Sequence, residues 1–195
     1  MKNIFIYPTD TVWGIGGNPF EIETYELIAK IKGTSVNKPL SILTNDVQQL
    51  ISISRGSESL DELFDDLFKF QITVGLPKAS LSLNFPTGPF DETSFICFRV
   101  IQNEIIDECI RDFPGFITST SLNLTGEDPI SDTEEANLFW QKHCPETNFI
   151  SSEFLTPSGK SSTIVFISGL SAKIIREGED IKKILETLDK HGINY

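Results

Sequence analysis

The sequence predicts a single α/β domain over residues 1–195, built on a mixed sheet with helices beside it. The chain is long enough for one sizeable hydrophobic core. Short apolar strand patterns alternate with helical patterns along its whole length, which is typical of α/β folds. We find no internal repeat, low-complexity tract or obvious linker that would divide it.

The N-terminal part is expected to hold a strand, a glycine-rich loop and a helix. Residues 4–7 have the pattern of a short buried strand, followed by a polar turn at 8–11. Residues 14–17 are rich in glycine, which predicts a flexible segment whose backbone can approach a ligand closely. Apolar residues at helical spacing predict a helix over 20–32 that stops at Gly33, and then a strand over 39–43.

The remaining elements follow from periodicity and capping signals. Ser59 and Glu62 form a capping box before the apolar stripe of a helix that reaches Phe68, and Asn103 caps another helix. Further helices are predicted over 46–53, 104–112, 131–143 and 180–190. Strands are predicted over 71–76, 79–85, 93–100, 116–120, 163–167 and 173–176, with a loop-rich stretch over 145–160.

Composition restricts the class of partner and the compartment. The formal net charge of −12 argues against sequence-independent binding to nucleic acid, which requires many cationic phosphate contacts. Three cysteines without metal-type or CxxC spacing predict free thiols in a reducing cytoplasm. We see no signal peptide and no apolar run of membrane-spanning length, so we expect no association with a membrane.

The segment 30–43 carries three lysines, Lys30, Lys32 and Lys38, around Gly33 in this acidic chain. Positive side chains at a bend between a helix and a strand can form a binding site for an anion. The alternative is a solvated helix terminus, because lysines there complement the helix dipole in any case. The segment by itself leaves both interpretations open.

The residue types exclude several kinds of catalytic site. The two histidines, His143 and His191, both fall near predicted helix C-termini, so a Ser-His-Asp triad is not expected. No Cys/His cluster has zinc spacing, and we predict no protein-held metal. The residues that remain at strand ends are hydroxyl, amide and cationic groups, which can orient phosphates and neutralise developing charge.

The segment 118–123 is the most informative polar stretch. Thr118, Ser121 and Asn123 belong to five polar residues in six that follow an apolar strand directly. Ligands of α/β proteins usually bind at the carboxyl ends of strands, so this segment is a candidate site. A plain turn is the alternative, and the chemistry of the residues does not decide between them.

Six motifs in order resemble the threonylcarbamoyl-AMP synthase family, which is also called YrdC-like. The first is Pro-Thr-Asp-Thr-Val-Trp-Gly at 8–14, and the second is Lys-Gly-Thr at 32–34 followed by Lys-Pro-Leu at 38–40. The others are Arg-Val at 99–100, Ser-Leu-Asn at 121–123, Ser-Thr-Ile-Val at 162–165 and Arg-Glu-Gly at 176–178. The resemblance covers nearly the whole chain.

The resemblance implies a twisted open sheet flanked by helices and a positively charged groove. It also implies an enzyme that condenses L-threonine, bicarbonate and ATP, with Mg²⁺ accompanying the nucleotide, into threonylcarbamoyl-AMP and pyrophosphate. That product would be handed to the tRNA threonylcarbamoyl transferase machinery, with weak or no direct binding of tRNA by this chain.

The resemblance also assigns roles to residues. It implies that Lys32, Ser121, Asn123 and Arg176 bind the ATP phosphates, with the first three also counted as catalytic. Thr11, Arg99 and Ser162 are expected around threonine and the carbamate. The remaining substrate-binding residues that we predict are Trp13, Thr34 and Thr118.

Two positions depart from the family pattern. Thr34 stands where the family has Arg, which removes a bidentate phosphate ligand, and Trp13 stands where Tyr is usual. Two other functions therefore stay open at this point. One is a non-catalytic nucleotide- or RNA-binding module on the same fold, and the other is a carbamoyl-transfer domain like those of hydrogenase maturation proteins.

Overall fold

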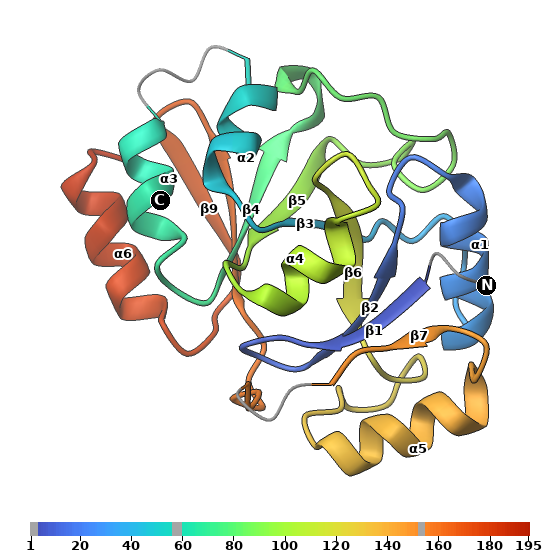
Figure 1. Cartoon of the computed structure of the whole chain (residues 1–195). Coiled ribbons are helices and arrows are strands. Elements are labelled where there is room, and N and C mark those ends of the chain that lie inside the picture. Colours follow the sequence, from blue (N-terminus) through green and yellow to red (C-terminus); the bar gives the residue numbers. More distant parts are fainter. Residues whose placement is uncertain (1–3, 56–59, 152–154) are drawn as a thin grey trace.

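A computed structural model describes residues 4–55, 60–151 and 155–195, which form one mixed sheet with helices packed around it (Figure 1). The strands of the described part are β1 (Ile4–Pro8), β2 (Trp13–Gly17), β3 (Ser41–Thr44), β4 (Ile72–Pro77), β5 (Phe95–Val100), β6 (Ile117–Ser121), β7 (Asn148–Phe149), β8 (Thr163–Ser168) and β9 (Ser171–Arg176). The helices of that part are α1 (Ile22–Lys32), α2 (Val47–Ile53), α3 (Asp61–Leu67), α4 (Glu104–Ile110), α5 (Thr133–His143), α6 (Ile181–Lys190) and the 3₁₀ turn η1 (Lys78–Ser80).

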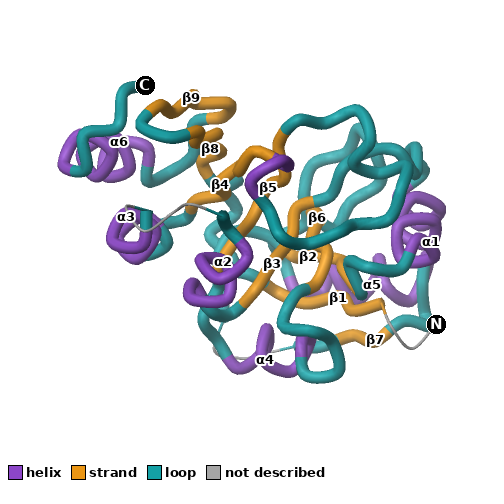
Figure 2. The backbone as a smooth tube through the Cα atoms, turned by 90° about the horizontal axis from the view of Figure 1, so that it is seen from above, coloured by secondary structure: helices purple, strands orange, loops and turns teal. Residues whose placement is uncertain are grey.

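All strands of the described residues belong to one sheet, in the order β7-β1-β2-β6-β3-β5-β4-β8-β9. The pairs β1–β7, β3–β5 and β4–β8 are parallel, and the other neighbours are antiparallel. Seen from above, the strands turn progressively along this order, so the sheet is open and twisted (Figure 2). The predicted fold class, a single α/β domain with a mixed sheet, is confirmed.

Successive side chains of the strands contribute alternately to two hydrophobic clusters. The larger cluster contains Ile42 of β3, whereas the smaller one contains its neighbour Leu43 together with Ile117 of β6. Successive side chains of a strand point to opposite faces, so the two clusters lie on opposite faces of the sheet. The smaller cluster is covered by Ile105, Ile106, Cys109 and Ile110 of α4. The larger cluster gathers side chains from α1, α2, α3, α5 and α6.

The predicted helix caps are present where the structure describes them. Gly33 ends α1 with a positive φ of 64°, as expected of a glycine at this position. Asn103 caps α4 by accepting a hydrogen bond from the backbone N of Ile106 at 2.9 Å, and Asp132 caps α5 by accepting from Glu134 and Glu135. Ser59, the predicted cap before α3, lies outside the described residues.

The prediction of a flexible glycine loop at residues 14–17 was wrong. These residues form strand β2, which pairs with β1 and β6. A Cβ atom on Gly16 would collide with the carbonyl oxygen of Thr118 in β6, and one on Gly14 would lie 3.0 Å from the ring of Tyr7. The glycines therefore allow close packing within the sheet.

The prediction of a strand over 79–85 was also wrong. The described chain forms the turn η1 there, with one isolated bridge between Leu81 and Ser54. The backbone groups of Ser80 and Ser82 bond to Arg55 and Ile53 at the end of α2, at 2.7 and 2.8 Å, so they do not join the sheet. In the stretch predicted as loop, 145–160, β7 adds a short strand beside β1.

Candidate functional site

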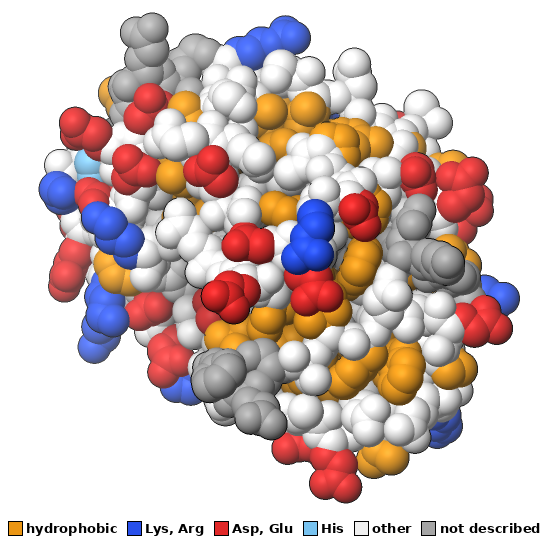
Figure 3. Space-filling model, in the orientation of Figure 1, with side chains coloured by type: hydrophobic (Ala, Val, Ile, Leu, Met, Phe, Trp, Pro, Cys, Tyr) orange, Lys and Arg blue, Asp and Glu red, His pale blue; other side chains and the backbone are white. Residues whose placement is uncertain are grey.

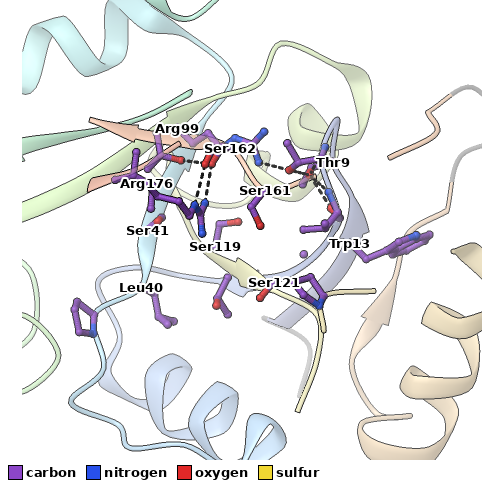
Figure 4. Close-up of a pocket in the computed structure, with 18 of the residues that line it drawn as sticks. Thr9, Trp13, Leu40, Ser41, Arg99, Ser119, Ser121, Ser161, Ser162 and Arg176 are labelled. Carbon is purple, nitrogen blue, oxygen red and sulfur yellow. Dashed lines mark hydrogen bonds between the residues drawn. The ribbon is translucent and has the colours of Figure 1, made fainter. Parts of the chain in front are cut away.

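A cavity of about 350 Å³ opens on the face of the sheet that carries the smaller cluster, beyond the cover of α4. Ser41 and Ser119 lie opposite each other on β3 and β6, two residues from Leu43 and Ile117, and therefore share this face. The side chains that line the cavity are mostly hydroxyl and cationic groups (Figure 4). They come from Thr9, Thr11, Lys38, Ser41, Thr73, Arg99, Ser119, Thr120, Ser121, Ser161, Ser162 and Arg176.

Arg99 of β5 is held in a fixed direction by the turn between β1 and β2. Its Nη2 lies 2.6 Å from Oδ1 of Asp10, and its Nη1 donates to the hydroxyl of Thr11 at 2.7 Å. Thr11 is itself hydrogen-bonded to Thr9 at 2.9 Å. Burial lowers the pKa of Arg99 from its usual value, and the Asp10 carboxylate opposes this shift. The contacts of Nη1 with Thr11 and of Nη2 with Asp10 fix the plane of the guanidinium. Its remaining N–H donors are available to a ligand in the cavity that Arg99 lines.

Arg176 at the end of β9 reaches the cavity beside the start of β8. Its Nε donates to the carbonyl oxygen of Ser162 at 3.0 Å and its Nη2 to the Ser162 hydroxyl at 3.3 Å. The hydroxyls of Ser162 and Thr73 lie 2.8 Å apart. Burial lowers the pKa of Arg176, and the positive charge of Arg99 lowers it further. The two guanidinium groups are therefore close enough to repel each other electrostatically.

The cavity concentrates positive charge in an acidic protein. Its lining includes Lys38, Arg99 and Arg176. Among the described residues, Arg99 is paired with a carboxylate, whereas Lys38 and Arg176 form no salt bridge. Two uncompensated cations beside rows of hydroxyl groups favour an anionic ligand.

The polar segment at the end of β6 contributes to the cavity through three residues. Ser119, Thr120 and Ser121 line it, which supports the interpretation of this segment as a site. Ser119 accepts a hydrogen bond from the hydroxyl of Tyr7 at 2.9 Å, and Ser121 donates to Oδ1 of Asn123 at 2.6 Å. The amide of Asn123 donates to the carbonyl oxygens of Leu124 and Glu127, so this residue holds the loop that follows Ser121.

Lys32, which the resemblance assigns to the ATP phosphates, lies outside the lining of the cavity. Its side chain is buried, with 4% exposed, and its Nζ contacts the carbonyl oxygens of Ser121 and Asn123 and Oδ1 of Asn123. Burial, together with the charge of Lys38, lowers the pKa of Lys32 to about 8. The ammonium satisfies three oxygens of one loop, so in this structure it fixes the shape of the loop that carries Ser121.

Three other predicted residues do not direct their side chains into the cavity. Trp13 is among the residues that line the cavity, but its indole is buried against Phe149, at 5.1 Å between ring centroids, and points away from the pocket in Figure 4. Thr118 is fully buried, and its hydroxyl bonds the backbone of Gly17 in β2. Thr34 follows the end of α1 and borders a separate small crevice that it shares with Lys38.

Sequence reasoning missed several residues that the fold brings to the cavity. Ser41 and Ser119 come together through strand pairing, and Thr73 lies on β4 facing Ser162. Alternation along each strand predicts which residues share a face, but it does not predict which strands are neighbours. Asp10 was quoted as part of a motif, and its contact with Arg99 spans most of the N-terminal half of the chain.

Other chemistries find little support among the described residues. His143 ends α5 and His191 follows α6, as predicted, and neither lines the cavity. Within the described ranges, no three His, Cys, Asp or Glu side chains gather as metal ligands. Across the same ranges, no helix has the length and apolar character needed to cross a membrane.

Comparison with known proteins gives a consistent result. The Sua5/YciO/YrdC family model, described as "Telomere recombination", matches residues 2–178. A threonylcarbamoyl-AMP synthase of Buchnera aphidicola is 30% identical over 138 residues, covering 69% of this chain and 73% of that protein. Another from Acinetobacter baumannii is 25% identical over 179 residues and covers 89% and 90%. Both relatives thus carry the name of an enzyme, threonylcarbamoyl-AMP synthase, which is of the nucleotidyltransferase type.

Solved structures share the fold. Escherichia coli YciO superposes with a TM-score of 0.75 at 21% identity, covering 94% of this chain and 87% of that one. Pyrococcus abyssi Sua5, solved in complex with L-threonine, gives a TM-score of 0.75 at 22% identity, and the match covers 94% of this chain but 54% of that protein. Together, the match over residues 2–178 and the shared fold show that the chain belongs to the Sua5/YciO/YrdC family.

Proposed function

We propose that this protein is an L-threonylcarbamoyladenylate synthase, which makes threonylcarbamoyl-AMP and pyrophosphate from L-threonine, bicarbonate and ATP. The observation that carries the proposal is the cavity in which Lys38 and Arg176, with no carboxylate partner among the described residues, lie beside the hydroxyls of Ser119, Thr120 and Ser121. The family membership and the names of the curated relatives support it.

The chemistry needs positioning and charge neutralisation more than proton transfer. The amine of threonine takes up bicarbonate with loss of water to give a carbamate, whose oxygen then attacks the α-phosphorus of ATP and expels pyrophosphate. In this proposal Arg176 and Lys38 neutralise the phosphates, and Ser121 donates to a phosphate oxygen. Neither a histidine nor a carboxylate lines the cavity within the described chain, which agrees with phosphoryl-type catalysis by oriented cations and hydroxyls.

The other end of the cavity suits the amino acid and its carbamate. Arg99 presents a planar guanidinium that matches a carboxylate in shape and charge. Thr11 and Ser162 lie at hydrogen-bond distance from Arg99 and Arg176, respectively. We assign Arg99, Thr11 and Ser162 to threonine and the carbamate. Lys32 and Asn123 act indirectly in this assignment, by holding the loop of Ser121.

Magnesium would enter with ATP. Mg²⁺ usually keeps several waters and is held through substrate phosphates, with few protein ligands. The lining of the cavity fits this mode, because its cations and hydroxyls suit the phosphates that would carry the ion, and the described residues offer no cage of carboxylates. When bound, the ion would neutralise part of the phosphate charge.

The biological setting belongs to the same proposal. Threonylcarbamoyl-AMP would be passed to a tRNA threonylcarbamoyl transferase in the cytoplasm. The net charge of −12 supports hand-over of the small molecule without strong binding of tRNA by this chain.

Release of pyrophosphate tests the proposal. The purified protein is incubated with labelled ATP and Mg²⁺, with and without L-threonine and bicarbonate, and pyrophosphate is quantified. We expect release that requires both co-substrates and falls at least tenfold in Arg176→Ala. Pyrophosphate release at the same rate without threonine and bicarbonate, or ATP binding without any release of pyrophosphate, would contradict the synthase activity. Either result would indicate a different nucleotide-binding function.

A further inference from the structure

Gln71 lies directly before β4 and joins three segments that border the cavity from outside. Its side-chain Nε2 donates to the carbonyl oxygen of Asp10 at 3.1 Å, and its Oε1 accepts from the hydroxyl of Ser158 at 3.3 Å. Its backbone N donates to Oδ2 of Asp180 at the start of α6, and its carbonyl oxygen accepts from the backbone N of Thr163. One residue thus contacts the β1–β2 turn, the segment before β8 and the N-terminus of α6.

The turn and the segment before β8 also bond to each other at this place. The backbone N of Ser158 donates to the carbonyl oxygen of Asp10 at 3.0 Å, and that of Gly159 donates to Thr11 at 2.8 Å. The carbonyl oxygen of Asp10 therefore receives two donors, one of them the Gln71 carboxamide. These contacts fix the backbone of the two residues whose side chains hold Arg99.

We propose that Gln71 is a positioning residue for the cavity, acting through Asp10 and Thr11 on the direction of the Arg99 guanidinium. Gln71 is absent from the cavity lining and borders a neighbouring groove on the other side of Asp10. Its influence on a ligand therefore passes through the turn. The proposal rests on the proposed function, because it gives Arg99 the role of holding threonine or its carbamate.

A carboxamide suits this place because it carries a donor and an acceptor on one planar group. Glutamate keeps the length and can still accept from Ser158, but its carboxylate cannot donate to the Asp10 carbonyl and repels it. When that glutamate is protonated, its O–H restores a donor. Gln102 provides a matched control, since it lines the same groove with an exposed side chain and sits after β5.

The test compares Gln71→Ala, Gln71→Glu and Gln102→Ala in the full chain. We expect Gln71→Ala to lower kcat/KM for L-threonine about tenfold while KM for ATP stays within about twofold. The deficit of Gln71→Glu should shrink as the pH is lowered, measured relative to the unmodified protein at each pH. In an Arg99→Lys background, Gln71→Ala should cause little further loss, because both changes act on the same group.

A second readout does not depend on turnover. In the ligand-free protein, the ¹⁵N–¹H resonance of the Arg99 side chain should shift in Gln71→Ala and stay in place in Gln102→Ala. An unchanged Arg99 resonance, or a loss of activity that is equal for threonine and ATP and additive with Arg99→Lys, would overturn the positioning role. If the unmodified protein makes no threonylcarbamoyl-AMP, the proposed function fails, and the Arg99 resonance still decides whether Gln71 orients that side chain.

Discussion

At the scale of single residues, Lys32 shows how burial changes the meaning of a motif. The sequence places it in a cationic segment, and the structure places its ammonium among three oxygens of the loop after β6. Replacement by Met would remove the donor that these three oxygens share, so we expect Lys32→Met to lower the free energy of unfolding by about 3 kcal/mol. Urea denaturation measures this change, with Lys30→Met on the same helix as control. Equal stability of the two variants would contradict the assignment.

The same residue predicts a pH dependence with a defined sign. Burial lowers the pKa of Lys32 from its usual value near 10.5 to about 8 in the folded protein, so between these values the unfolded chain binds more protons. Stability contributed by Lys32 must therefore rise with pH across this window. The difference in unfolding free energy between the unmodified protein and Lys32→Met should grow by about 2 kcal/mol from pH 8 to pH 10. A constant difference would show that Lys32 keeps its usual pKa, and a shrinking difference would show that folding raises it.

Lys38 and Thr34 give the next prediction at this scale. Lys38 lines the cavity, whereas Thr34, which stands where the family pattern has Arg, lies outside the lining. We expect Lys38→Ala to weaken ATP binding about tenfold, the loss of one charged contact to phosphate. Thr34→Ala should leave it nearly unchanged. Thr34→Arg should strengthen ATP binding if the longer side chain reaches the phosphates. Calorimetric titration with ATP compares the three, and a larger loss in Thr34→Ala than in Lys38→Ala would reverse the roles.

At the scale of elements, the glycines of β2 determine whether the central sheet can form. A Cβ on Gly16 would overlap the Thr118 carbonyl oxygen of β6, and backbone at the centre of a sheet has little room to move. We expect Gly16→Ala to destabilise the fold by about 3 kcal/mol or more, and Gly14→Ala, which meets the edge of the Tyr7 ring, to be milder. Thermal denaturation of the two variants checks this order. A Gly16→Ala protein of unchanged stability would contradict the packing.

Sequence reasoning succeeded for elements whose signal is local. The helices α1 and α4 follow from short-range patterns, with Gly33 and Asn103 as their markers. It failed for β2, because glycine is rare in strands unless another segment of backbone packs closely against it. Here that segment is β6, which lies more than a hundred residues further along the sequence. Asp66 illustrates the same limit. It lies on α3 and pairs with Lys190 and His191 of the C-terminal region, which no short-range pattern indicates.

At the scale of the whole molecule, the protein combines an acidic net charge of −12 with a small cavity lined by cationic residues. On the face shown in Figure 3, acidic side chains are widely spread and basic ones are interspersed among them, so this face offers no continuous basic surface. We expect no measurable binding of tRNA at physiological salt, because sequence-independent binding needs many cationic contacts. A mobility-shift titration with unmodified tRNA provides the check. Binding that weakens steeply with salt would reveal a basic surface on another face.

The candidate site was predictable in outline because its residues belong to motifs that follow one another in the order expected of the family. Arg99, Ser121, Ser162 and Arg176 were named from the sequence, and the structure brings them to one cavity. The directions of Trp13 and Lys32 were not predictable, since each depends on packing between β2, β7 and the loop after β6. Several residues of this candidate cavity could therefore be named from the sequence, whereas the contacts that support them depend on the three-dimensional fold.

The measurement that tests this account most directly is the mass of the product formed with labelled bicarbonate. The protein is incubated with ATP, Mg²⁺, L-threonine and ¹³C-bicarbonate. The nucleotides are then separated and their masses are measured by mass spectrometry. The account predicts threonylcarbamoyl-AMP that carries one ¹³C atom, in an amount equal to the pyrophosphate released. A product without the label, or AMP and pyrophosphate without any threonine adduct, would contradict it.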